Sequence, residues 1–517
     1  MNRKEMLVKA GVLTGSVFFF REKIFAESLP SVLKHKKGFN IYNVAEIKKL
    51  FPNYSLDNVL KLIVSEIKKK SYPNKFGGGG VIYFPPGIWE IQKTILLPSL
   101  TTLMGMGGFF HQHGIYEDGF DKKQHTVIKL KKNANCNIVQ PENINSYGIQ
   151  IKGIILDGNK HQQNNERNFA GIYLPDINKE EGLDGVRSNL FVQDVMLYNC
   201  KGDGIYAGNN QNEFRLDNVL ASRNDGNGFL FSGTDILLSN VWAGDNGKNG
   251  FYVKGGGAVS AINCDSWGNK HNGLLLDNYT QNNTFTRLQC NLNVQNGVQI
   301  RGGVSSTTFI GSVFKQNSKI LGKGFSVSFA NVKLFSENNN SPRSIKFIGC
   351  QFGEGNMQQP ATTFGIEDVS DKIFPNTILG STFAENEFAK GKVNKNVFKN
   401  YSINNCTAGN YGGEIVFENT RSKFIKIKND YTILPDDKII LINSKAKNIK
   451  LTLPSLNELP PGTEIKIIKQ YKENSFILQT QFNEKLQSIT NNKIFVDDIA
   501  LSYLLVIHAE TTWILTK

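Results

Sequence analysis

The sequence predicts an all-β solenoid, in which short strands form successive coils that stack on one another. Between residues 171 and 302 one phrase occurs six times: a glycine followed by alternating apolar and variable residues. The last five glycines are 24, 22, 23 and 24 residues apart. A near-constant period of this length is typical of solenoids, whose coils bury their apolar faces against each other. The six glycines are Gly171, Gly204, Gly228, Gly250, Gly273 and Gly297.

The repeat also predicts which side chains are buried, because successive residues of a strand point to opposite faces. One and three positions after each glycine every residue is apolar, so we expect these side chains to fill the coil interior. They are Ile172, Leu174, Ile205, Ala207, Phe229, Phe231, Phe251, Val253, Leu274, Leu276, Val298 and Ile300. The residues two and four positions after each glycine are then expected to face outward.

The N-terminus has the layout of an export signal over residues 1–26. Arg3, Lys4 and Lys9 precede an apolar run over residues 10–20, and Ala26 marks a cleavage site. This run is too short to span a bilayer comfortably, and no later stretch of the sequence qualifies as a membrane span. We therefore expect an exported protein, located in the periplasm, on the cell surface or outside the cell.

A helix and a glycine-rich motif precede the repeats. Residues 43–70 show apolar residues at helical spacing. A glycine run (Gly77–Gly80), a strand (Val81–Tyr83), a Phe-Pro-Pro-Gly turn (Phe84–Gly87) and a Leu-x-Gly-x-Gly segment (Leu103–Gly107) follow. Together they resemble the opening of the pectate-lyase-like superfamily, and the resemblance extends over roughly residues 42–410.

The resemblance implies a right-handed parallel β-helix over residues 42–412, with an N-terminal capping helix. Members of this superfamily include pectate and rhamnogalacturonan lyases, polygalacturonases and rhamnogalacturonases, epimerases and phage tailspike depolymerases. A polysaccharide partner is therefore implied and, from the tailspikes, a homotrimer. The residues themselves identify no cofactor and no metal-binding cluster, and calcium is implied by the resemblance alone.

Residues 413–517 differ in composition from the repeats. Alternating segments such as FIKIK, KIILIN, IKLTL and YLLVIHA are separated by turns. This pattern predicts a small antiparallel, sandwich-like β module. It resembles the modules that end some phage tail proteins.

The net charge bears on the class of partner. The chain has 59 basic and 45 acidic residues, a formal net charge of +14, which favours anionic partners such as acidic polysaccharides. Because the basic residues are spread along the chain, a nucleic-acid partner is not expected.

Two outward columns of the repeats form the predicted site. Lys254, Asp277 and Arg301 stand four positions after their glycines, and rungs about 4.8 Å apart would stack them as a charged ladder. These three are the candidate catalytic residues. Aromatic faces beside charges suit a sugar-binding groove. The candidate substrate-binding residues are Tyr206, Tyr252, Gln299 and His271. The alternative is a surface ion-pair ladder without function.

The reaction stays open between two chemistries. A lyase needs a base and a cation near a uronic carboxylate, which Lys254, Arg301, Tyr252 and His271 could supply. A hydrolase needs two carboxyl groups at a defined separation. The pairs to consider join Asp277 with Asp265, Asp245, Asp217 or Glu213. The sequence thus predicts a protein that binds and depolymerises a polysaccharide; a non-catalytic adhesion protein is the alternative.

Two further residue sets are expected to be structural. Asp203, Asn227, Asn249, Asn272 and Asn296 directly precede repeat glycines, where stacked polar side chains would hold the turn. The cysteines form no short-spaced metal or redox motif. Four of them lie in apolar strands and are expected to be single buried thiols: Cys200, Cys264, Cys290 and Cys350.

Overall fold

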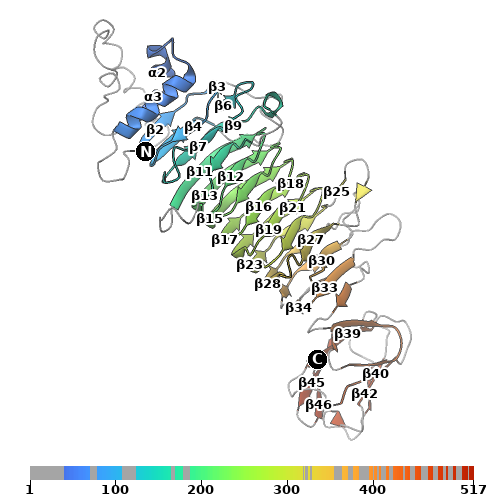
Figure 1. Ribbon diagram of the computed structural model, residues 1–517. Helices are drawn as coiled ribbons and strands as arrows, with labels where there is room; N and C mark the ends of the chain where they lie inside the picture. The colour runs from blue at the N-terminus through green and yellow to red at the C-terminus, as the bar shows by residue number, and fades with distance from the viewer. Residues whose placement is uncertain are drawn as a thin grey trace.

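The computed structural model describes residues 40–69, 79–107, 124–164, 169–177 and 187–317, followed by the strands and some of the turns as far as Thr516. Its main body is a stack of coils whose strands pair in parallel with those of neighbouring coils (Figure 1). The solenoid prediction is therefore confirmed. The expected export signal lies outside the described residues.

Each coil contributes to three faces. Face 1 is a sheet of twelve strands. They are β4 (Ile95–Leu97), β7 (Val139–Pro141), β10 (Ile172–Leu174), β12 (Ile205–Ala207), β14 (Phe229–Phe231), β16 (Phe251–Lys254), β19 (Leu274–Asp277), β22 (Val298–Arg301), β27 (Ala330–Phe335), β30 (Phe364–Asp368), β33 (Lys395–Lys399) and β36 (Ile415–Glu418). Five of the six glycine phrases coincide with the consecutive strands from β12 to β22, and the first with β10.

Faces 2 and 3 belong to one bent sheet, joined by three long strands that contribute to both: β11 (Arg187–Tyr198), β13 (Asn212–Ser222) and β15 (Thr234–Gly244). Face 2 also contains β1 (Ile41–Asn43), β2 (Gly80–Tyr83), β5 (Thr101–Met104), β8 (Gln150–Lys152), β17 (Gly257–Ile262), β20 (Gln281–Thr286), β23 (Ser305–Ile310), β28 (Arg343–Ile348), β31 (Asn376–Leu379) and β34 (Tyr401–Asn404). Face 3 also contains β3 (Gly87–Ile91), β6 (Thr126–Leu130), β9 (Ile155–Asp157), β18 (Asp265–Trp267), β21 (Gln289–Asn291), β24 (Val313–Lys315), β29 (Gln351–Phe352), β32 (Thr382–Phe383) and β35 (Thr407–Ala408).

The predicted cap of the first coil is present, but the single helix expected over residues 43–70 is two helices separated by a turn. The side chain of Asn43 accepts hydrogen bonds from the backbone N–H groups of Ala45 and Glu46 and so begins α2 (Val44–Leu50). Helix α3 (Leu56–Lys69) buries Val59 and Ile63 against the apolar core of the first coil, which closes the open end of the solenoid. Two short elements lie in turns, the 3-10 helix η2 (Lys160–Gln162) and the hairpin of β25 (Lys319–Ile320) and β26 (Gly324–Phe325).

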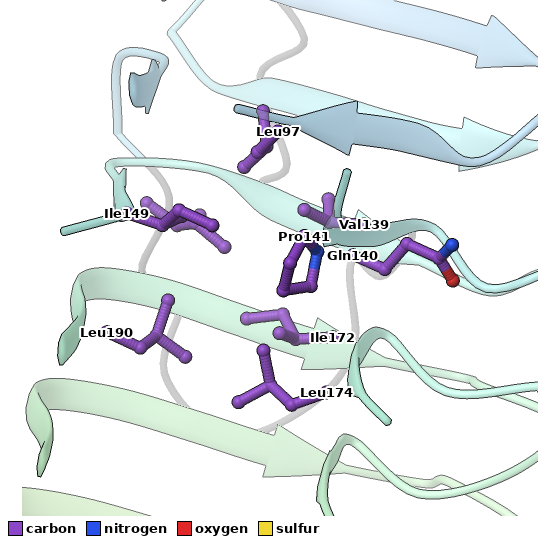
Figure 2. Close-up of a pocket in the computed structure, with 9 residues that line it drawn as sticks. Leu97, Val139, Gln140, Pro141, Ile149, Ile172, Leu174 and Leu190 are labelled. Atoms are coloured by element: carbon purple, nitrogen blue, oxygen red, sulfur yellow. The ribbon is translucent and has the colours of Figure 1, made fainter. Parts of the chain in front are cut away.

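The coil interior is continuous and closely packed. All twelve side chains expected there are buried, the most exposed being Phe251 at 3 %. Aromatic rings stack from rung to rung, as Phe229 does on Phe251 with ring centres 5.2 Å apart. The interior between β4, β7 and β10 is lined by apolar side chains (Figure 2), and the gap among them has no room for a water molecule. It is packing rather than a ligand site.

The corner between faces 2 and 3 depends on residues that tolerate a left-handed backbone. Asp194, Asn218, Asn240 and Asn263 have φ of 54°, 55°, 51° and 54° at equivalent positions of successive rungs. Asn and Asp adopt this conformation at lower cost than other residues with a Cβ atom, because their side chains form local hydrogen bonds. Here the side chain of Asn218 donates to that of Asp194 at 2.6 Å.

Two amide ladders run along the turn between face 3 and face 1. The expected ladder is present: each asparagine side chain donates to the preceding one at 2.9–3.0 Å, and Asn227 donates to Asp203 at its end. The sequence interpretation missed a second, fully buried ladder whose side chains donate toward the C-terminus at 2.8–3.0 Å. It contains Asn224, Asn246, Asn269, Asn293, Asn317 and Asn331.

The prediction of single buried thiols is confirmed within the described residues, but only Cys290 lies in a strand, and Cys200, Cys264 and Cys350 lie in the connections next to strands. Cys136, Cys200, Cys264, Cys290 and Cys350 are free thiols, and all except Cys136 are buried.

The C-terminal module is present, but its description as antiparallel is wrong. Its two sheets are mixed. The chain alternates between them from β37 to β45, and up to β42 each return to a sheet by a crossover gives a parallel pair. One sheet contains β37 (Lys423–Ile427), β39 (Asp437–Ile442), β41 (Glu464–Lys469), β43 (Lys485–Leu486), β45 (Tyr503–Ala509) and β46 (Thr512–Thr516); the other contains β38 (Tyr431–Thr432), β40 (Ile449–Thr452), β42 (Phe476–Gln479) and β44 (Lys493–Val496). Among the described strands, the antiparallel pairs are β41 with β45, β42 with β44 and β45 with β46. Strand β36 still pairs with face 1, so the solenoid extends past residue 412.

Candidate functional site on face 1

The outward side of face 1 carries a column of aromatic and polar residues that is interrupted by Leu230 and Leu275. The register aligns Tyr173 with Tyr206 on adjacent strands, and their rings stack with centres 5.1 Å apart. Further along the same column the register aligns Tyr252, Leu275 and Gln299. The sequence-predicted residues Tyr206, Tyr252 and Gln299 therefore share one column, as expected from the strand period.

Three successive rungs of face 1 converge on one carboxylate. Asp277 at the end of β19 accepts a hydrogen bond from the Tyr252 hydroxyl on β16, 2.9 Å from its Oδ2 atom. The Arg301 guanidinium on β22 reaches the same oxygen at 2.6 Å. These three side chains are called the Tyr252–Asp277–Arg301 cluster below. Charged and neutral donors together satisfy a carboxylate that would otherwise be costly to bury.

Asp277 is not a surface residue, contrary to expectation. Its side chain faces outward but is only 6 % exposed. The side chains of Tyr252 and Arg301 bond to it from the rungs on either side and cover it. The strand period predicts the direction of a side chain but not what its neighbours place over it. Leu275 is likewise buried between Tyr252 and Gln299 of the adjacent strands.

The protonation states of the cluster follow from its contacts. Burial opposes ionisation of Asp277, but the hydrogen bond and charge of Arg301 outweigh it, and the pKa of Asp277 is lowered. Burial, and then the neighbouring Asp277 carboxylate, raise the pKa of Tyr252 to about 12. At neutral pH the cluster thus contains a carboxylate, a phenol and a guanidinium, and Asp277 cannot act as a general acid.

The predicted charged ladder is only partly formed. Lys254 and Asp277 are opposite each other in the register, yet no hydrogen bond or ion pair involves the exposed Lys254 ammonium within the described part of the chain. Of the two predicted cations, Lys254 and Arg301, only Arg301 pairs with Asp277. The Tyr252 hydroxyl occupies the side of the carboxylate that faces the preceding rung. Lys254 is therefore a cation available to a ligand.

The sequence interpretation missed the acidic partner of Arg301. Nε of Arg301 lies 3.3 Å from the carboxylate of Glu337, in the turn after β27. The column also continues to Lys333 and Glu367, which form an ion pair at 2.8 Å. The regular period ends after Gly324, so the spacing of the repeats could not align these residues with the earlier rungs.

The remaining predicted binding residues differ in their availability. Gln299 accepts a hydrogen bond from the Asn296 side chain at 3.2 Å and so supports the turn ladder. His271 is exposed in the turn before β19, where partial burial of the imidazole and then the Lys248 ammonium lower its pKa. Tyr206 donates to Asp176 at 3.4 Å, and burial followed by that carboxylate raises the pKa of Tyr206 to about 12.

The proposed hydrolase pairs are not brought together on one face. Asp277 lies on face 1, whereas Asp265 begins β18 of face 3 and Asp217 lies on the face 2 part of β13. Asp245 lies at the corner after β15. Glu213 lies three rungs from Asp277, which corresponds to about 14 Å. The predicted pairings are therefore wrong. The successive strands of one coil belong to different faces, so their outward side chains point in different directions.

The described residues contain neither a metal-binding cluster nor a membrane-spanning helix. No group of three or more His, Cys, Asp or Glu side chains is placed there to hold a metal ion. Calcium thus remains an expectation from the resemblance. Neither helix described is long and apolar enough to cross a bilayer.

Comparison with known proteins supports the architecture. A family model described as a right-handed beta helix region matches residues 183–341. No sequence among curated proteins matches the chain. The A-module of the Azotobacter vinelandii mannuronan C-5 epimerase AlgE6 is similar in structure, with a TM-score of 0.50 and 17 % identity over 73 % of this chain and 98 % of that module.

A second similar structure is the full-length tailspike protein 2 from the Escherichia coli O157:H7 bacteriophage CAB120. Its TM-score is 0.52 and its identity 14 %, over 72 % of this chain and 47 % of the tailspike. At these identities the likeness shows the fold. The chain is a right-handed parallel β-helix protein, as the opening motif implied.

Proposed function

We propose that this protein binds a polysaccharide along the outward side of face 1. The observation that carries the proposal is the column that begins with the stacked Tyr173 and Tyr206 rings and leads to the Tyr252–Asp277–Arg301 cluster. Aromatic rings offer apolar surfaces for pyranose rings, and the charged groups beside them offer hydrogen bonds to hydroxyls. A column that crosses several rungs suits an extended polymer.

The preferred ligand is an acidic polysaccharide. The exposed Lys254 ammonium has no internal partner in the described structure and can pair with a carboxylate of the ligand. Arg301 is neutralised by Asp277 and Glu337, so it contributes orientation more than net charge. The net charge of +14 acts in the same direction. The similarity to an epimerase of mannuronan, whose name identifies a polysaccharide, is consistent with this ligand class.

For depolymerisation, we propose elimination in preference to hydrolysis. Hydrolysis requires a protonated carboxyl group opposite a second carboxylate, whereas Asp277 is kept ionised by Arg301. Elimination requires a base for the proton next to a uronic carboxylate and a cation near the developing negative charge. Lys254 on β16 and Arg301 on β22 supply such groups two rungs apart on face 1, with Asp277 of β19 between them.

A non-catalytic adhesion protein is the second candidate. It is favoured by one observation: the Tyr252 hydroxyl and the Arg301 guanidinium are already bonded to Asp277. Only Lys254 of the predicted catalytic residues is then unengaged. Binding without turnover would need nothing more than the geometry of face 1.

One experiment separates these candidates. Purified protein is incubated with polymannuronate, polygalacturonate, amylose and soluble cellulose oligomers, and unsaturated products, reducing ends and binding heats are followed. We expect binding and ultraviolet absorbance with an acidic polymer. Reducing ends without absorbance would indicate hydrolysis, and binding alone would indicate an adhesion protein.

The Lys254→Ala variant links the result to face 1. We expect it to lose at least tenfold in affinity for the acidic polymer. Lys346→Ala is the matched control, because Lys346 is an exposed lysine on face 2. Equal affinities of the two variants and the wild type would exclude face 1 as the binding surface.

We further propose that the protein is exported, as the N-terminal pattern predicts, and that it assembles as a homotrimer, as the resemblance implies. N-terminal sequencing of protein recovered outside the cytoplasm would locate the cleavage site, for which residue 26 is expected. Sedimentation velocity would give the assembly state, and a monomer across the micromolar range would contradict the trimer.

A further inference from the structure

The outward side of face 3 carries an apolar cluster that ends in two tryptophans. Its first members lie on β6, β9, β11 and β13, and Trp242 on β15 and Trp267 on β18 pack against them at one end. A Cβ atom on Gly244 would come within 2.4 Å of the Trp267 ring. The indole thus lies over Gly244, in the space that the glycine leaves on the neighbouring strand.

A carboxylate lies directly beside these rings. Asp265 is opposite Trp242 in the register and precedes Trp267 by two residues, so all three point outward from face 3. Oδ1 of Asp265 is shielded from solvent and has no hydrogen-bond partner within the described structure. Asn291 on β21 is opposite Trp267 in the register, and its Oδ1 atom is likewise shielded from solvent and without a hydrogen-bond partner in the described structure.

The charges around Asp265 explain its proton affinity. Burial raises the pKa of Asp265 to about 6, while the Ser266 backbone N–H and the Lys315 ammonium on β24 oppose the shift. At the preceding corner, Asp245 is near Arg223, and burial also raises the pKa of Asp245. The Cys264 and Cys290 thiols lie on the buried side of the sheet.

We propose that face 3 holds a second saccharide-binding site, in which Trp242 and Trp267 stack on a pyranose ring and Asp265 and Asn291 hydrogen-bond its hydroxyls. The unpaired atoms of both polar residues are acceptors, and sugar hydroxyls are donors. Both residues are partly exposed, so a side-chain rotation brings the unpaired oxygen to the surface. The inference takes only its ligand class from the proposed function, because face 1 is a separate surface.

The test is a fluorescence and calorimetric titration of the full chain with cellohexaose, maltohexaose, hexamannuronate and hexagalacturonate. Trp89 and Trp513 are the other two tryptophans of the chain and supply a constant background. We expect a saturable change in tryptophan emission with at least one hexasaccharide. No change with any of the four at millimolar concentration would overturn the proposal.

Variants distinguish a binding site from a cap on the apolar cluster. Asp265→Ala is expected to weaken binding about tenfold, a loss of about 1.4 kcal/mol. Asp265→Asn should keep most of the affinity and remove its pH dependence between about pH 5 and pH 7. Wild-type affinity in Asp265→Ala, or an unchanged pH profile in Asp265→Asn, would contradict the site.

Each variant is also tested for binding at the other surface, which distinguishes face 1 from face 3. Lys254→Ala on face 1 should leave the fluorescence change intact, and Asp265→Ala should leave binding of the acidic polymer at face 1 intact. Loss of both bindings in Lys254→Ala would show that the fluorescence change arises from face 1.

Discussion

Tyr252 and Asp277 are joined by a 2.9 Å hydrogen bond from a phenol on one rung of face 1 to a carboxylate on the next. Arg301 on the following rung binds the same oxygen atom. A single atom thus connects three coils that are separate in sequence by 23 to 24 residues per step. The cluster is at once a structural clamp between coils and the polar end of a candidate ligand surface.

Removing Arg301 should destabilise the protein by leaving Asp277 buried without a counter-charge. Arg301→Gln is expected to cost about 1–3 kcal/mol in the free energy of unfolding, below the value for fully buried pairs because the guanidinium is 28 % exposed. Urea denaturation followed by circular dichroism measures the change. In the double variant Arg301→Gln/Asp277→Asn the loss should be smaller than the sum of the two single losses. An additive result would show that the pair is not coupled.

The pH dependence of stability should differ in sign between two aspartates. For Asp277 the pKa is lowered in the folded state, so its contribution is present above the unfolded pKa of about 3.9 and is lost as the pH falls. The matching measurement compares wild type with Asp277→Asn. The free energy of unfolding of the variant should fall furthest below that of the wild type near neutral pH, and the difference should be smallest near about pH 3. A constant difference across this range would contradict the assignment.

Asp265 should behave in the opposite way. Its folded pKa of about 6 exceeds the unfolded value, so the folded state binds the proton more tightly and stability falls as the pH rises from about 4 to 6. Asp265→Asn is therefore expected to stabilise the protein at neutral pH by about 1–2 kcal/mol, with a smaller gain at about pH 4. Thermal unfolding at the two pH values checks this, and destabilisation at neutral pH would count against it.

The second amide ladder should be more important for stability than any exposed asparagine. Asn246 is fully buried, donates to Asn269 and Ala221, and accepts from Asn224. Asn246→Ala leaves these groups unpaired and should cost about 2–4 kcal/mol. Asn209→Ala, at an exposed position in a turn, is the control and should change stability by less than about 0.5 kcal/mol. Similar losses in both variants would refute a ladder contribution.

Two glycines should respond oppositely to substitution. Gly244→Ala would force the added methyl group into the Trp267 ring and is expected to destabilise the protein and shift tryptophan emission. Gly311 has φ of 55° at the corner between faces 2 and 3, with open space around it. Gly311→Asn should leave the free energy of unfolding unchanged or raise it by about 0.3 kcal/mol, because asparagine already occupies the equivalent corner of other coils. Paired denaturation curves test both, and equal destabilisation would contradict the corner argument.

Much of the architecture could be predicted because it depends on periodicity. The glycine phrase places Phe229 and Phe231 inside the coil, and the structure buries both completely. The opening motif and its resemblance supplied the capping helix and the handedness. The buried positions and the capping segment follow from local patterns that need no knowledge of distant contacts, whereas the handedness was implied by the resemblance alone. The mixed C-terminal sheets were not predictable in this way, since alternation describes strands but not the direction of their partners.

The candidate site was only partly accessible from the sequence. The register aligned Lys254 with Asp277, but it could not predict that the Tyr252 hydroxyl, and not the Lys254 ammonium, bonds to the carboxylate. That outcome depends on the conformations of the two side chains. Glu337 lies beyond the regular repeats, and its contact with Arg301 requires the path of the turn after β27. The hydrolase pairings failed because neighbours in sequence, such as Asp265 and Asp277, occupy different faces of one coil.

The two oppositely directed amide ladders have a consequence for how such a chain can change its size. Each ladder repeats once per coil, so removing or duplicating one complete coil, for example residues 250–272, would place an asparagine opposite an asparagine again and so preserve both ladders across the junction. A single-residue insertion would instead turn a strand inside out. Growth in whole coils would lengthen the surface presented to a polymer without redesign of the core. The length of the ligand-binding surface can therefore change in steps of one coil, by natural duplication or by design.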